Sequence, residues 1–210
     1  MIKNKLIDQI VDKILQEKPE IDRDYMADER RIELDIAAAV NTIYFQIFKK
    51  TPSNLDRYTK SYYNIPIIQD SNTLTWYSAL PAKIIQFPTI GDGVWRINDM
   101  QGTTVNFKPI KEKDIEYMES TDVGNISSVI WYVVRSQTSG GSSFNGIVEY
   151  YNPNVVLPSV VKMDLVPDFT EWLPTEDYPI PAGQDQNLIN MVVQQFKFKP
   201  AHRISNEQEL

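Results

Sequence analysis

The hydrophobic pattern divides the chain into helical ends and a strand-rich middle. Apolar residues recur every three or four positions over residues 2–17, 28–50 and 184–196, which is the spacing of amphipathic helices. Pro19 and Pro52 follow the first two stretches and prevent either helix from continuing. Each predicted helix has a single apolar face, so we expect the three helices to pack on one another.

Between residues 53 and 167 the pattern changes to short segments rich in Tyr, Trp, Ile and Val, separated by Pro, Gly and Asn. This composition is typical of strands joined by turns. The predicted strands span residues 62–68, 73–79, 93–98, 103–107, 128–135, 145–151 and 160–166. A short helix is expected at residues 111–119, and the Ser- and Gly-rich residues 136–143 are expected to form a flexible hairpin tip.

These elements predict an α+β fold in which an N-terminal helix pair and a C-terminal helix pack together, with an antiparallel β-sandwich or barrel-like insertion between them. The predicted parts are an N-terminal helical part (1–52), a β-rich insertion (53–167), an extended proline-containing arm (168–183), a C-terminal helix that completes the helical part (184–198) and a mobile tail (199–210). With 210 residues and 42% hydrophobic content, the chain can bury such a core without a metal or a disulfide.

Composition narrows the class of function. The sequence contains no cysteine, which excludes disulfides, thiolate metal sites and cysteine nucleophiles. The formal net charge of -7 argues against a protein that grips nucleic acid by neutralising phosphates. Asp8 and Asp12 interrupt the apolar residues at the start, and no uncharged run approaches the ~18 residues needed to span a bilayer. We therefore expect a protein kept in a cytoplasm, without a membrane partner.

No arrangement of residues predicts catalysis or a cofactor. The single histidine, His202, lies in the predicted mobile tail beside Arg203, where it would lack the fixed geometry that general base catalysis requires. The acidic residues at 22–29 lack the glycine and the alternating oxygen ligands of a calcium loop, so helix capping explains them better. Gly91-Asp92-Gly93 lacks the Lys-Ser or Lys-Thr of a phosphate loop and is typical of a turn. We expect neither enzyme activity nor a bound metal or cofactor.

Neighbouring aromatic residues occur in pairs within several predicted strands. The pairs are Tyr62 with Tyr63, Trp76 with Tyr77, Trp131 with Tyr132, and Tyr150 with Tyr151. Because successive side chains of a strand point to opposite faces, one ring of each pair is expected in the core and the other at a surface or interface. A stacking platform for sugars or single-stranded nucleic acid is the alternative.

Several short motifs follow one another along nearly the whole chain. They are Asp28-Glu29-Arg30-Arg31, Leu80-Pro81-Ala82, Phe87-Pro88, Gly93-Val94-Trp95-Arg96-Ile97, Phe107-Lys108-Pro109-Ile110 and Tyr178-Pro179-Ile180-Pro181. In this order they resemble the neck-ring, portal-adaptor or head-to-tail connector proteins of crAss-like tailed phages. The resemblance implies a structural virion protein, made in the host cytoplasm, that forms a ring in the neck below the portal and extends the DNA channel toward the tail.

The resemblance also implies the partners. They are further copies of the chain in a twelvefold ring, the portal protein, other neck-ring or tail proteins, and DNA that passes without specific binding. No catalytic residues come with such a family. A ring subunit needs two different interface patches, because its contacts are heterologous. We expect one of the two patches in the proline-containing arm and the tail, with these interface residues: Phe169, Trp172, Leu173, Tyr178, His202 and Arg203. Replacing Trp172 with alanine is then expected to weaken assembly and spare the monomer.

Other functions remain open from the sequence. A carbohydrate- or receptor-binding β module would show a concave aromatic patch with convergent polar groups. Another phage assembly protein is a further alternative. An enzyme that uses Asp and Glu alone, as glycosidases do, would place two carboxylates on one cleft at about 5 to 9 Å.

Overall fold

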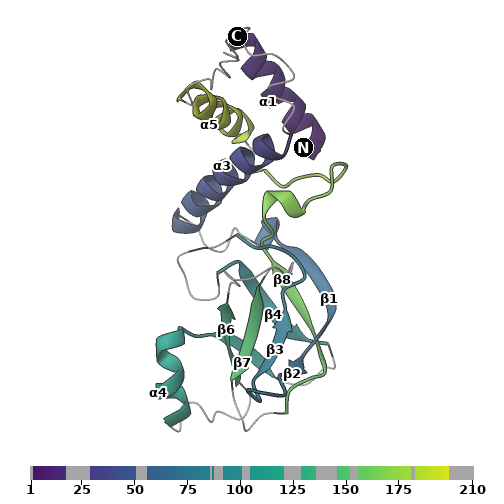
Figure 1. Cartoon of the computed structure of the whole chain (residues 1–210), viewed down its shortest axis with the longest axis vertical. Helices are drawn as coiled ribbons and strands as arrows, with labels where there is room; N and C mark the ends of the chain where they lie inside the picture. Colours follow the sequence, from purple (N-terminus) through teal and green to yellow (C-terminus); the bar gives the residue numbers. More distant parts are fainter. Residues whose placement is uncertain are drawn as a thin grey trace, which may run out of the picture. The chain divides into compact units, whose positions relative to one another are not determined.

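The computed structural model describes residues 2–17, 29–50, 56–85, 87, 92–100, 105–120, 129–135, 146–151, 156–180 and 183–198. Its helices are α1 (Lys3–Glu17), α3 (Glu29–Lys50), α4 (Ile115–Ser120) and α5 (Asp185–Phe198), with 3-10 helices η2 (Glu112–Asp114) and η4 (Phe169–Glu171) (Figure 1). Its strands are β1 (Lys60–Pro66), β2 (Ile68–Gln69), β3 (Trp76–Ala79), β4 (Val94–Asp99), β5 (Asn106–Pro109), β6 (Val129–Arg135), β7 (Ile147–Tyr151) and β8 (Val160–Leu165). The α+β class expected from the sequence is confirmed. The predicted hairpin tip at 136–143 and the tail at 199–210 lie outside the described residues.

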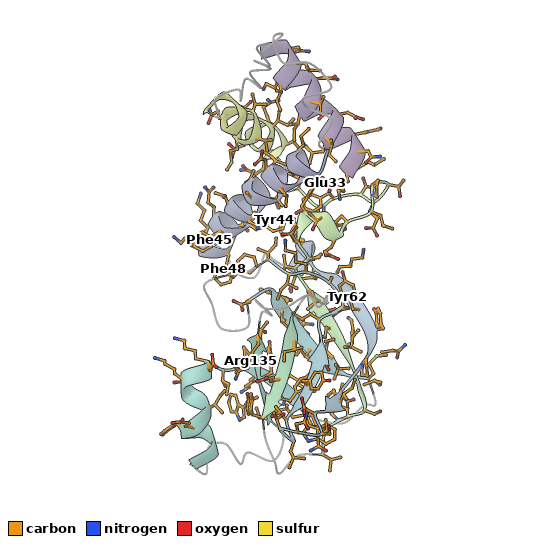
Figure 2. The ribbon with its side chains drawn as sticks, viewed as in Figure 1. Glu33, Tyr44, Phe45, Phe48, Tyr62 and Arg135 are labelled. Atoms are coloured by element: carbon orange, nitrogen blue, oxygen red, sulfur yellow. The ribbon has the colours of Figure 1, made fainter. Side chains whose placement is uncertain are left out.

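The chain divides into two compact units. A helical unit comprises Met1–Ile43 and Trp172–Leu210, and a β unit comprises Tyr44–Glu171. The boundary falls within α3, whereas the sequence placed the end of the helical part at residue 52. The last turns of α3 belong to the β unit because their rings stack there: Tyr44 lies 4.9 Å from Tyr58 and Phe48 lies 5.5 Å from Phe87, centroid to centroid (Figure 2).

In the helical unit α1 packs on α5. The apolar positions that predicted the helices are buried: Leu6, Ile10 and Ile14 on α1, Ile32, Ile36 and Val40 on α3, and Leu188, Ile189, Val192 and Val193 on α5. Full burial of one such side chain stabilises a fold by about 1.5–3 kcal/mol. The single apolar face of each helix therefore accounts for why these helices form one unit.

The β unit contains a three-stranded sheet in the order β1-β8-β4 and a five-stranded sheet in the order β2-β3-β7-β6-β5, among the described strands. β4 also lies against β5, and β1 against β3, so the edges of the two sheets approach each other as in a barrel. Strand β5 pairs parallel to β6, and the expectation of a wholly antiparallel insertion is wrong at this pair. The physical reason is the connection: η2 and α4 lie between these strands and form the crossover that a parallel pair needs.

One apolar core fills the space between the sheets. Strand β8 contributes Val161, Met163 and Leu165 at alternate positions, all fully buried. Gly93 precedes β4 where residues 84 and 85 cross it, and a Cβ at this position would lie 2.5 Å from the carbonyl oxygen of Ile85. Only glycine permits this close approach. The first residue of the Gly-Val-Trp-Arg-Ile motif is therefore a glycine because a larger residue would clash with the backbone of Ile85.

Candidate functional site

The proline-containing segment after β8 does not form a free arm. Phe169 is fully buried in the β unit and Tyr178 is fully buried in the helical unit. The ring of Trp172 stacks edge-on against Tyr178, with centroids 5.3 Å apart. The expectation that these aromatic residues gain little by folding back is therefore wrong. Replacement of Trp172 by alanine is now expected to destabilise the monomer.

The N-terminus of α1 explains why the segment folds back. The first N–H groups of a helix have no partner within the helix. Here the backbone N–H of Lys3 donates to the carbonyl of Glu176 (3.1 Å), and that of Asn4 donates to the carbonyl of Pro174 (3.2 Å). The segment from Trp172 to Tyr178 thus caps a helix at the opposite end of the sequence.

The side chain of Lys3 adds a buried charge where the start of α1 meets the segment from Trp172 to Tyr178, which we call the α1 junction. Its ammonium group donates to the carbonyl of Trp172 (2.9 Å), 169 residues away in sequence, and pairs with Glu33 of α3 at 2.9 Å. Only 3% of the Lys3 side chain is exposed. A buried charge is tolerated only when it is paired, so Lys3, Glu33 and Trp172 depend on one another.

The other predicted interface residues have different positions. Leu173 is 59% exposed, so its role at an interface stays a prediction. Trp172 is half-buried. His202 and Arg203 lie outside the described residues. The structure brings Trp172 and Tyr178 together as a contact within one chain, which leaves Leu173 as the exposed apolar residue of this set among those described.

A different segment presents apolar side chains to solvent. The hairpin of β2 and β3 exposes Ile68, Leu74 and Trp76, and Leu74 is 67% exposed. Leu74 has φ +58°, in the left-handed region that side chains other than glycine rarely adopt. The sequence predicted a strand from residue 73, whereas β3 begins at Trp76.

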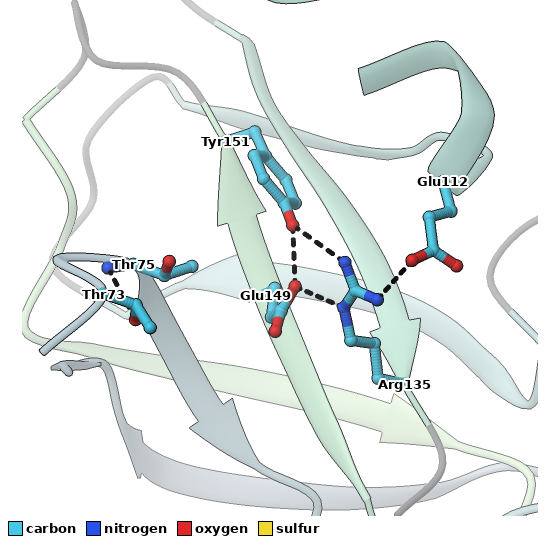
Figure 3. Close-up of polar contacts among 6 residues, drawn as sticks. All are labelled: Thr73, Thr75, Glu112, Arg135, Glu149 and Tyr151. Carbon is cyan, nitrogen blue, oxygen red and sulfur yellow. Dashed lines mark hydrogen bonds and ion pairs between the residues drawn. The ribbon is translucent and has the colours of Figure 1, made fainter. Parts of the chain in front are cut away.

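Hydrogen bonds within the hairpin hold its turn. One carboxylate oxygen of Asp70 accepts the backbone N–H groups of Asn72 (2.7 Å) and Thr73 (3.2 Å), and the Asp70 carbonyl accepts that of Leu74 (2.9 Å). The Thr73 hydroxyl accepts the N–H of Thr75 at 3.4 Å, as Figure 3 shows. Asp70-Ser71-Asn72 is a run of turn-forming residues, and this signal could have located the hairpin from the sequence.

A polar cluster lies on the face of the five-stranded sheet opposite the core. Arg135 at the end of β6 donates to Glu149 of β7 and to Glu112 of η2, and its third nitrogen lies 3.5 Å from the Tyr151 hydroxyl (Figure 3). The Tyr151 hydroxyl donates to the same oxygen of Glu149 at 2.6 Å. The bonds to Tyr151 and Glu149 raise the pKa of Arg135, which therefore stays charged. This arrangement joins η2 to two strands.

The aromatic pairs follow the sheet faces as expected. Tyr132 and Tyr150 are buried between the sheets, whereas their neighbours Trp131 and Tyr151 lie on the opposite face. Burial raises the pKa of both core hydroxyls, and Tyr150 donates to Ser78 at 3.1 Å. The prediction of one ring in the core and one outside is confirmed for these pairs.

Within the described ranges, no group of three or more His, Asp or Glu side chains is arranged to hold a metal ion. No helix in the described part of the chain is long and apolar enough to cross a bilayer.

Comparison with known proteins gives no match, because neither a protein-family model nor a curated protein is similar enough to this chain. Function must therefore be inferred from the residues and geometry of the chain.

Proposed function

We propose that this chain is a structural subunit that assembles with copies of itself into the connector ring between the portal and the tail of a phage. The observation that carries the proposal is Leu74, which is 67% exposed on a turn that its own hydrogen bonds fix, while Ile68 and Trp76 are exposed on the flanking strands β2 and β3. The occupant of this surface is a neighbouring copy of the chain. The order of motifs that resembles neck-ring proteins supports the connector role in particular.

The backbone of Leu74 supports an interface role for the hairpin. A left-handed conformation costs a residue with a side chain roughly 1–2 kcal/mol. Leu74 accepts this strain at φ +58° and exposes its side chain, so the monomer gains little burial in return. Strained residues of this kind cluster at functional positions. Burial of such a side chain against another subunit contributes about 1.5–3 kcal/mol when it is complete.

The net negative charge of the chain is compatible with a subunit that lines a channel for DNA. The chain has a formal net charge of -7, and an acidic subunit does not hold the phosphates of DNA that passes through a ring. The channel would then guide DNA without specific binding.

The positions of the exposed rings favour assembly over a sugar-binding module. Tyr63 lies on the outer face of the three-stranded sheet, Trp76 lies on β3 of the other sheet, and Tyr117 lies on α4. A stacking platform needs several rings on one face. The carboxylates of Glu112 and Glu149 also differ from a glycosidase pair. The guanidinium of Arg135 contacts both and occupies the space between them in which a substrate would have to lie.

The test is assembly of the full chain, alone and mixed with portal protein, measured by native mass spectrometry and by two-dimensional class averages. We expect a ring whose formation is reduced in Leu74→Asn, because asparagine tolerates the left-handed backbone and removes the apolar side chain. Leu34→Gln is the matched control, since Leu34 is an exposed leucine on α3. A chain that stays monomeric with the portal at high concentration would overturn the proposal, as would equal assembly of wild type and Leu74→Asn.

A further inference from the structure

In the segment Glu112–Ser120, formed by η2 and α4, none of the side chains described over residues 112–117 is buried. No residue of η2 is buried, and Tyr117 of α4 is exposed. A helix of six residues, such as α4, does not persist alone in water because helix nucleation is unfavourable. The segment therefore depends on its attachment to the sheet.

Two links fix the start of this segment to β6. The backbone N–H of Ile110 donates to the carbonyl of Tyr132 at 2.9 Å, which extends the pairing of β5 with β6 by one bond. Two residues later, Glu112 accepts a hydrogen bond from Arg135. The backbone bond ends the strand, and the side-chain bond holds the 3-10 helix η2 that comes after the strand.

The two sides of the Arg135 cluster differ in exposure. On the sheet side, Glu149 is 17% exposed and is also bonded to the Tyr151 hydroxyl. On the segment side, Glu112 is 68% exposed. Salt screens exposed charge pairs far more than buried ones. Figure 3 shows the guanidinium between Glu112 on one side and Glu149 with Tyr151 on the other. We therefore expect the bond to Glu112 to break first, while Glu149 and Tyr151 keep the guanidinium oriented.

We infer that the ion pair of Glu112 with Arg135 is a latch that holds the segment Glu112–Ser120 on the sheet. When the latch opens, the segment moves as a unit about Ile110, while the pairing of β5 with β6 and the contact of Arg135 with Glu149 persist. The latch responds to ionic strength and does not depend on ring assembly.

The test is hydrogen exchange of the full chain, followed by mass spectrometry. Glu112→Gln removes the charge of the latch and keeps the shape of the side chain. An exposed ion pair is worth about 0.2–1 kcal/mol, so amides of residues 112–120 are expected to exchange roughly two to five times faster. In wild-type protein, salt at about 1 M should produce the same increase, because the Debye length falls to ~3 Å.

Glu116→Gln is the matched control, because it removes the same charge from α4 without touching Arg135. It should leave exchange of the segment unchanged, and amides of β8 should be unchanged in every sample. Equal exchange in Glu112→Gln and Glu116→Gln would overturn the inference. Faster exchange of β8 together with the segment would also overturn it, because β8 belongs to the other sheet and the cluster would then hold the whole β unit.

Discussion

Two irregular segments of the molecule carry large apolar side chains and place them in opposite environments. The segment from Trp172 to Tyr178 buries the Tyr178 ring and half-buries the Trp172 ring, and its carbonyls receive hydrogen bonds from α1. The turn between β2 and β3 is held by Asp70, a residue of the turn itself, and leaves Leu74 exposed. A turn that satisfies its own backbone needs nothing from the rest of the chain, so its apolar residues remain available to another chain.

The sharpest challenge to this comparison is Tyr178→Ala, for which we expect the largest effect. Loss of a fully buried ring leaves a cavity, and the free energy of unfolding should fall by about 3–5 kcal/mol in urea titrations. A loss below about 1 kcal/mol would mean that the site collapses freely and that the segment adds little to the core.

The α1 junction gives the second test. Lys3→Ala removes the buried ammonium group and leaves the carbonyl of Trp172 and the carboxylate of Glu33 without this donor. A buried group that loses its partner costs about 1–3 kcal/mol, and Glu33 is 28% exposed, so the free energy of unfolding in urea should fall by about this amount for the Trp172 carbonyl. The control is Lys5→Ala on the exposed side of the same helix, which should change stability by less than about 0.5 kcal/mol. Equal losses in both variants would contradict the role of the junction.

Alkaline pH tests the core next to the hairpin. Trp76 of β3 pairs with Tyr150 of β7, and Tyr150 pairs in turn with Tyr132 of β6. Burial raises the pKa of Tyr132 above its ordinary value of 10.0, so the unfolded chain loses this proton at lower pH than the folded chain. Stability is complete below pH 10 and falls above it, by up to about 1.4 kcal/mol per pH unit for each such group.

Tyr132→Phe keeps the ring and removes the titrating hydroxyl. We expect thermal or urea unfolding above pH 10 to depend less steeply on pH in this variant than in the wild type. An identical slope would show that Tyr132 ionises equally in the folded and the unfolded chain.

The smallest expected effect concerns the hairpin itself. Leu74→Gly relieves the left-handed strain but increases the freedom of the unfolded chain, so the free energy of unfolding should rise by at most about 1 kcal/mol or stay unchanged. A decrease of more than about 1 kcal/mol in the monomer would place Leu74 in a monomer contact and remove the contrast between the two segments.

The sequence predicted the regular elements well and the irregular ones poorly. The apolar stripes located α1, α3 and α5 within one or two residues at each end, because helix periodicity is a local property. The predicted strand at 62–68 divides into β1 and β2, and the parallel pairing of β5 was missed. Pairing direction depends on where a strand meets its partner, which no short window of sequence contains.

The candidate sites show the same limit. The hydrogen bonds that hold the segment around Tyr178 come from α1, which is distant in sequence, so the local proline pattern alone indicated an arm. The Arg135 cluster depends on register, since the pairing of Arg135 with Ile147 brings its guanidinium beside Glu149. The turn at Asp70 was predictable in principle from its residue types, but the exposure of Leu74 required the backbone angle.

Capping of α1 by Pro174 and Glu176 also sets an order of events during synthesis. The β unit, Tyr44–Glu171, is continuous in sequence, so a nascent chain can complete it once Glu171 has left the ribosome. Helix α1 emerges first yet receives its capping carbonyls only after residues 174 and 176 have followed. Until then its first N–H groups bond to water, and the helical unit waits for the loop closure that brings residues 3 and 4 to residues 176 and 174.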